Sequence, residues 1–279
     1  MNRQLDLIAV LKETARGALS ALVPTLGWGL LFVGTYIAAL LALSDGRFDP
    51  QLARYIAIAL MIGVSCVWGA AIYRLLLAPT TGNSLAKDSG KLILANLLVY
   101  MVFIIVAFIA MLFLVIVSGI LVIASGYDPS TADPSEISGS MDALRASGAV
   151  WVLYGLIAVV SGVLVWFALR LVLYGATTIA RGRVLVFQSW PLTKGAGLRL
   201  ALLAGVFIGL PAASLMLAHL NHVPTFLWLA VPDGAVSLQG AVLGVVLNAG
   251  AFLFGHSFAA ALYRRLGVDA DVSVGSDDG

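Results

Sequence analysis

The sequence predicts an all-α integral membrane protein, a bundle of about six transmembrane helices. Hydrophobic residues make up 61% of the 279 positions, and charged residues only 11%. A soluble domain carries about 25% charged residues, so a water-facing surface cannot be built from this composition. Six long apolar stretches follow one another along the chain, and crossing a hydrocarbon core takes about 20 such residues. Lipid is therefore the expected solvent for most of the chain.

The six predicted spans are separated by short polar segments. They cover residues 18–43, 55–77, 92–115, 149–169, 200–220 and 238–263. Two apolar runs are longer than a span, since the third continues to Ala124 and the fourth continues past Arg170 to Ala180. We expect part of each run to kink, to lie along an interface or to extend outside the core.

The basic residues of the short loops predict the orientation, because cytoplasmic loops carry an excess of Lys and Arg. Twelve lie on one side: Arg3, Lys12, Arg16, Arg74, Lys87, Lys91, Arg181, Arg183, Lys194, Arg199, Arg264 and Arg265. Only Arg47, Arg54 and Arg145 lie on the other. The sequence therefore predicts a multi-pass membrane protein with both termini cytoplasmic. Residues 125–148 then form an external loop.

The two ends of the chain differ from its middle. Residues 1–14 mix charged and apolar positions, which is typical of an amphipathic helix on the membrane surface. Residues 1–266 are predicted to form one transmembrane domain that includes this segment. Residues 267–279 carry four aspartates and are predicted to be a disordered cytoplasmic tail.

Similar residues end the even-numbered spans. The second ends with Tyr73-Arg74, the sixth with Tyr263-Arg264, and the fourth reaches Arg170 shortly before Tyr174. One interpretation is a repeat of three helical hairpins in parallel orientation, and the other is chance similarity among apolar segments. The repeat predicts that Arg74, Arg170 and Arg264 lie in one layer at the cytoplasmic interface. An arginine at the bilayer centre would cost about 2.5–3.5 kcal/mol.

Small residues mark the expected helix contacts, because they let backbones approach closely in lipid. The predicted packing residues on the fifth and sixth spans are Gly205, Gly209, Gly240, Gly244 and Gly255. Packing of these two spans on each other is one interpretation, and a contact between two copies of the chain is the other. The few polar residues inside spans are Asn96, Asn248 and His256. We expect them to form hydrogen bonds between helices.

The motifs of catalytic and metal sites occur only in incomplete form. Residues 255–259 approach the nucleophile-elbow pattern, but they lie inside an apolar helix and not on a strand-to-helix turn. His219 and His222 are spaced like metal ligands, but the glutamate of zinc hydrolases is missing between them. No Asp or Glu lies inside a span, which argues against a proton-coupled carrier. We predict no catalytic residues, no metal site and no cofactor.

The segment 181–195 is the most distinctive in the chain. It alternates apolar and polar residues between flanking basic ones, and Trp190 suits the headgroup level, so it is expected to lie on the bilayer. The predicted lipid-headgroup contacts are Arg74, Arg170, Arg181, Arg183, Trp190, Lys194 and Arg264.

The element Ser189-Trp190-Pro191-Leu192-Thr193-Lys194-Gly195 resembles one found in a loose group of bacterial polytopic membrane proteins. These are similar to the membrane domain that is fused to some glycerophosphodiester phosphodiesterases. The resemblance covers residues 170–203, and elsewhere it extends only to topology. It implies a membrane-helix fold but no activity, because the phosphodiesterase part is absent.

These observations favour a non-catalytic membrane protein, a lipid-contacting accessory or assembly subunit. The alternative is a channel or transporter for a small solute, which the parallel repeat and Pro211 would suit. Membrane lipids are the expected partners, together with other membrane-protein subunits or a second copy. The net charge of +2 gives no reason to expect nucleic-acid binding.

Overall fold

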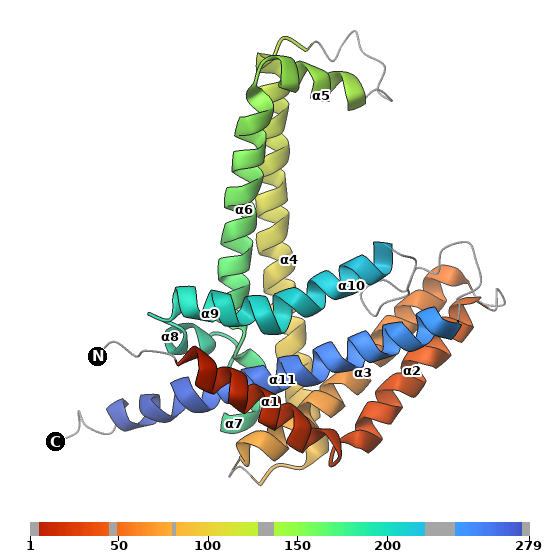
Figure 1. Ribbon diagram of the computed structural model, residues 1–279, viewed down its shortest axis with the longest axis vertical. Helices are drawn as coiled ribbons and strands as arrows, with labels where there is room; N and C mark the ends of the chain where they lie inside the picture. Colours follow the sequence, from red (N-terminus) through yellow and green to blue (C-terminus); the bar gives the residue numbers. More distant parts are fainter. Residues whose placement is uncertain (1–5, 45–48, 80–81, 128–136, 221–237, 275–279) are drawn as a thin grey trace. The chain divides into compact units, whose positions relative to one another are not determined.

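The computed structural model describes residues 6–44, 49–79, 82–127, 137–220 and 238–274, and these residues form helices and no strand (Figure 1). The long helices are α2 (Leu26–Ser44), α3 (Pro50–Leu77), α4 (Leu85–Ala124), α6 (Ala149–Leu171) and α11 (Leu238–Val274). The shorter helices are α1 (Leu7–Leu22), α5 (Ile137–Ala146), α7 (Tyr174–Arg181), α8 (Ser189–Leu192), α9 (Gly197–Ala204) and α10 (Leu210–Leu220), and a π-helical segment η1 (Gly205–Gly209) joins the last two.

Five helical segments are long and apolar enough to cross a membrane. A sixth span results if α1 and α2, which are bent by 82°, are counted together. The prediction of an all-α membrane protein with about six spans is therefore confirmed.

The chain divides into two compact units. The first contains Met1–Leu97 and Leu169–Gly279, and the second contains Leu98–Ala168. Our prediction placed residues 1–266 in one domain. Helix α11 continues through Val274, so residues 267–274 are helical where we predicted the start of a disordered tail, and residues 275–279 lie outside the described residues.

The first predicted span is broken near its start. Pro24 has no backbone N–H to continue the helical ladder, and α1 ends at Leu22. The Thr25 hydroxyl donates to the carbonyl oxygen of Ala21 over 2.7 Å, and the indole N–H of Trp68 donates to the same hydroxyl over 3.0 Å. The bend at residues 23–25, which we call the α1–α2 elbow, therefore separates α1 from α2 and is held to α3 by Trp68.

Helix α1 is amphipathic, but it does not lie apart from the other helices. Its buried side chains include Val10 and Thr14, and the helix packs against α11 and α3. From Leu7 onward this region is part of the first unit, and its location on the membrane surface remains a prediction. The face of small residues formed by Gly17, Ala18 and Ala21 permits the close packing.

Helix α11 is central in the first unit, where it contacts α1, α2, α3, α7, α8, η1 and α10. One core cluster joins it to α2 and α3, with the rings of Trp68 and Phe252 stacked at 4.9 Å and Phe32 against both. Another joins it to α1 and α9 around Phe258 and Leu200. In Figure 1, α3 and α11 both run from right to left, as the repeat predicts for two even-numbered spans.

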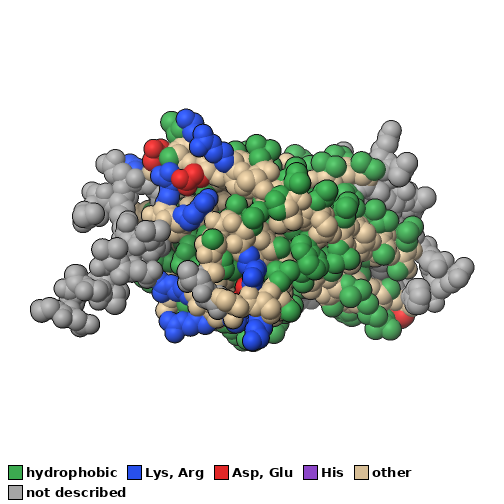
Figure 2. Space-filling view, turned by 90° about the horizontal axis from the view of Figure 1, so that it is seen from below, with side chains coloured by type: hydrophobic (Ala, Val, Ile, Leu, Met, Phe, Trp, Pro, Cys, Tyr) green, Lys and Arg blue, Asp and Glu red, His purple; other side chains and the backbone are tan. Residues whose placement is uncertain are grey.

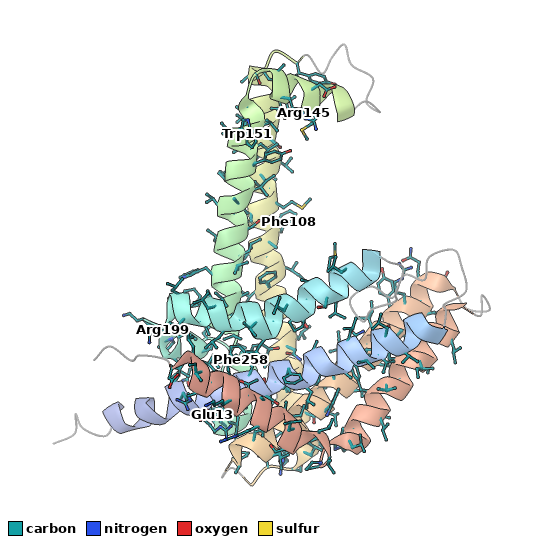
Figure 3. All side chains as sticks on the ribbon, viewed as in Figure 1. Glu13, Phe108, Arg145, Trp151, Arg199 and Phe258 are labelled. Atoms are coloured by element: carbon teal, nitrogen blue, oxygen red, sulfur yellow. The ribbon has the colours of Figure 1, made fainter. Side chains whose placement is uncertain are left out.

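The second unit contains two apolar helical segments that bury very little surface. None of the 18 residues in the most apolar window of α4 is buried. In the segment Ala149–Arg181, which contains α6, 11% of the corresponding window is buried. Figure 3 shows Phe108 and Trp151 on these helices, with exposed fractions of 65% and 75%. A helix that is apolar all round and unpacked suits lipid. The over-long third run is one continuous helix of 40 residues, about 60 Å long, whereas the fourth breaks before α7.

The predicted contact between the fifth and sixth spans is confirmed, because η1 and α10 both contact α11. The role given to the glycines differs. Gly205 and Gly209 are exposed, and a Cβ atom built on Gly205 or Gly255 would meet nothing within 4 Å among the described residues. Gly244 is buried and Gly240 is half-buried. Gly205 and Gly209 are four residues apart and would share a face of a regular α-helix, but they begin and end the π-helical turn η1, in which this spacing does not hold.

Candidate lipid-contact surface

The three tyrosines that accompany the repeated arginines lie around one core cluster. Tyr73 is buried in it, and Tyr174 and Tyr263 pack against it. Close backbone approach is needed here, since a Cβ atom on Gly175 would lie 3.0 Å from the Tyr73 hydroxyl oxygen. The tyrosines therefore share one environment inside the first unit. The predicted layer of arginines remains a prediction.

Arg74 is held by a buried carboxylate that our sequence analysis did not identify. Its Nη1 atom lies 2.7 Å from Oδ2 of Asp88 and donates to the carbonyl oxygen of Asn83 over 2.5 Å. The Asp88 side chain is fully buried, and its Oδ1 lies 3.9 Å from Nζ of Lys91. The pair joins the end of α3 to the first turn of α4. Arg74 therefore joins two helices through a protein carboxylate, and its predicted lipid contact remains a prediction.

Arg170 is brought to the distinctive segment by Thr193. Its Nη1 donates to the Thr193 hydroxyl oxygen over 3.3 Å. Thr193 is fully buried, and its hydroxyl lies 3.1 Å from the carbonyl oxygens of both Ser189 and Trp190. This hydrogen bond holds the guanidinium at the end of α6 beside the turn that follows α8.

The turn itself accounts for the unusual residues of the element 189–195. Ser189 is buried and donates to the carbonyl oxygen of Val186 over 2.9 Å, and Leu192 is part of the core cluster around Phe258. Gly195 has a φ of +84°, a conformation that glycine adopts without strain. Lys194 is exposed between these fixed positions. The backbone therefore holds Lys194 at the surface next to the residue that orients Arg170.

The other predicted contacts lie in two places. Arg181 ends α7 and donates to the Gln188 side-chain oxygen over 2.8 Å, which folds the segment 181–188 on itself, and Arg183 is exposed. Arg264 is exposed on α11, and its neighbour Arg265 forms a two-point ion pair with Glu13 at 2.7 and 3.0 Å. The structure thus brings Arg170 together with the segment 181–194. It gives Arg74 and Arg264 different neighbours.

Basic side chains gather toward one end of the face that Figure 2 shows, while the other end is largely hydrophobic. No acidic residue occurs between Asp142 and Asp233, a stretch that contains Arg170, Arg181 and Lys194. Each acidic side chain that the structure describes bonds to a backbone N–H or a basic residue outside residues 170–199: Asp6, Glu13, Asp49, Asp88 and Asp142. The segment is therefore strongly positive.

The polar residues inside the spans all contact protein. Tyr174 donates its hydroxyl to Oδ1 of Asn96, whose Nδ2 donates to Sγ of Cys66 over 2.9 Å, so Asn96 links three helices as predicted. Asn248 is buried and bonds to the carbonyl oxygen of Gly244 on its own helix. His256 is packed between the rings of Tyr73 and Phe252, with centroids at 4.9 and 4.2 Å.

A metal-ligand set is not found among the described side chains, where no group of three His, Cys, Asp or Glu residues comes together. The His219–His222 pair lies outside the residues whose side chains the structure describes. Ser257, in the segment 255–259 that approaches the nucleophile-elbow pattern, is fully buried inside α11. This burial explains why a nucleophile pattern in a helix does not form an accessible site there.

Comparison with family models, with curated proteins and with solved structures found no match. The functional interpretation therefore depends on the residues themselves. Sequence reasoning missed Asp88, because it lies before the third span, and Thr193, because a threonine gives no signal of its own. The distinctive residues 189–195 around Thr193 were the only sequence signal that this position matters.

Proposed function

We propose that this chain is a non-catalytic, lipid-contacting accessory or assembly subunit of the bacterial inner membrane, with both termini in the cytoplasm. One observation carries this proposal. The polar side chains within the spans are used for packing between or along helices, while the apolar surface of α4 and α6 is left open to the membrane. A protein that turned polar groups toward a solute would require the opposite arrangement.

The excess of basic residues near span ends supports the orientation and the lipid contact together. Arginine at the interface can reach phosphate oxygens with its planar fork of donors, and the tryptophan of the same segment suits the headgroup level. Other membrane-protein subunits, or a second copy, are the remaining partners that we propose.

Purification in a mild detergent or a nanodisc, followed by native mass spectrometry, tests the proposal. We expect retained membrane lipid, either alone or with a second protein subunit. A chain that carries neither lipid nor partner protein, and that supports solute flux in proteoliposomes, would contradict the proposed function.

A small-solute channel or transporter is the second candidate, and the π-helical turn in the fifth span favours it. Such turns frequently occur at functional sites, and η1 ends two residues before Pro211. His256, whose Nδ1 has no hydrogen-bond partner in the described part of the chain, would be the first residue to examine. Flux of small solutes into proteoliposomes that is lost in His256→Phe would support this candidate.

A further inference from the structure

The turn that follows α8 combines three features of a headgroup site within a few residues. Arg170 is partly buried and is oriented by Thr193 at 3.3 Å. Lys194, the next residue, is exposed. Trp190 is half-buried in the same turn, with its carbonyl oxygen 3.1 Å from the Thr193 hydroxyl. The Arg170 guanidinium therefore lies at Thr193, and Trp190 and Lys194 belong to the same short turn.

The arrangement is fixed before any ligand arrives. Thr193 and Ser189 are fully buried, Leu192 is packed in the core, and the left-handed Gly195 holds the turn closed. The Ala196 amide also donates to the Thr193 carbonyl oxygen over 3.4 Å. A preorganised site loses less conformational entropy on binding than a flexible one does. A mobile surface lysine cluster would not offer this advantage.

The charge of the turn defines the class of ligand. Residues 170–199 contain five basic residues and no acidic one, so the composition of this segment suits an anion. Guanidinium groups bind phosphate through two parallel N–H···O bonds. Arg170 ends a helix whose most apolar window is almost entirely exposed, so the anion would sit where a hydrocarbon segment ends.

We propose that Arg170 and Lys194 bind the phosphate of an anionic phospholipid, with Trp190 against its glycerol or acyl-chain region and Thr193 as the positioning residue. This inference rests on the proposed lipid-contacting function and makes it specific to one site. The shared chemistry is a phosphate ester, which a soluble metabolite could also supply, so the test separates the two sources.

The test uses the full chain in nanodiscs of equimolar phosphatidylcholine and phosphatidylglycerol. The protein is extracted, and the lipids that it retains are quantified by mass spectrometry. For the parent we expect phosphatidylglycerol to be enriched over phosphatidylcholine. In Arg170→Gln the enrichment should fall by about tenfold, as loss of a charge-assisted hydrogen bond predicts. Lys194→Gln should reduce it by a smaller factor, and Thr193→Val should reduce it while both charges remain.

Arg145→Gln is the matched control, because Arg145 is an arginine outside the turn, 3.3 Å from Asp142. It should retain as much phosphatidylglycerol as the parent. Each variant is checked for its elution volume and melting temperature. If Arg170→Gln does not fold, Lys194→Gln decides, since its side chain is exposed and unfolding is not expected.

Three results would overturn the site. Equal retention by the parent, Arg170→Gln and Lys194→Gln would show that anionic lipid binds elsewhere, while the lipid-contacting function would stand. Displacement of the lipid by glycerol 3-phosphate at similar concentrations would show that the turn takes soluble phosphate esters. A parent that retains no anionic lipid would contradict the site, and if it retained no lipid or partner of any kind, the proposed function as well.

Discussion

Two close side-chain contacts hold helices of the first unit together. Asp88 is fully buried yet has an ion pair with Arg74 at 2.7 Å, and Gly69 leaves room for the imidazole of His256. Neither role is visible from the type of residue alone. The structure therefore identifies two side-chain contacts that the sequence does not reveal, and one substitution tests each of them.

Replacing Asp88 with alanine should lower the stability of the first unit. The change would leave Arg74, which is 35% exposed, without its carboxylate. Breaking a fully buried pair costs about 3–5 kcal/mol, and the exposure of the arginine reduces this to about 1–3 kcal/mol. Thermal unfolding in detergent measures the effect. Asp142→Ala removes an exposed ion pair and should have almost no effect, so equal melting of the two variants would contradict this account.

Gly69→Ala should also destabilise the protein, because the new Cβ atom would lie 2.9 Å from Cε1 of His256. Overpacking of this kind costs about 1–3 kcal/mol. Gly63→Ala on the same helix is the matched control, since its Cβ would meet nothing within 4 Å. A comparison of melting temperatures is sufficient. The prediction would be wrong if Gly69→Ala were as stable as Gly63→Ala.

At the scale of elements, the break between α1 and α2 is the feature that differs most from expectation. The 82° bend follows from Pro24 and from the double role of the Thr25 hydroxyl, which donates to Ala21 and accepts from Trp68. The apolar run 18–43 gives no sign of this in its hydropathy. An uninterrupted apolar run therefore predicts the presence of a helix better than its direction.

Trp68→Phe should loosen this elbow while keeping most of the aromatic packing with Phe32 and Phe252. The lost hydrogen bond is worth about 1 kcal/mol. Hydrogen–deuterium exchange should become faster for the amides of residues 23–29. Trp151→Phe, at an exposed position, serves as the control and should leave this exchange unchanged. Unchanged exchange in Trp68→Phe would mean that Pro24 alone fixes the bend.

For the whole molecule, composition and periodicity were sufficient to predict the class and the positions of the membrane helices. Few charges and long apolar runs leave lipid as the only suitable solvent. The pairing of Arg74 with Asp88, and of Arg170 with Thr193, could not be predicted, because it depends on how separate helices meet. The contacts predicted for Gly205 and Gly209 assumed a regular α-helix, whereas these two glycines begin and end a π-helical turn.

The orientation is the whole-molecule property that remains to be measured. A reporter fused after Gly279 should behave as cytoplasmic, and one inserted at Ser138 as external, because most basic residues lie in the loops assigned to the cytoplasm. Alkaline phosphatase activity reports an external position of the fusion site, and green fluorescent protein fluorescence reports a cytoplasmic one. With a cytoplasmic N-terminus, an external C-terminus would contradict an even number of crossings.

Cys66 offers a practical consequence for labelling chemistry. It is the single cysteine of the chain and is buried, and its sulfur accepts a hydrogen bond from Asn96 at 2.9 Å. A serine oxygen can accept the same bond, so Cys66→Ser should give a folded, thiol-free background. Single cysteines introduced at Lys194 or Arg145 could then react with a membrane-impermeant maleimide. Spin labels or fluorophores attached at the same positions would report distances directly in the bilayer.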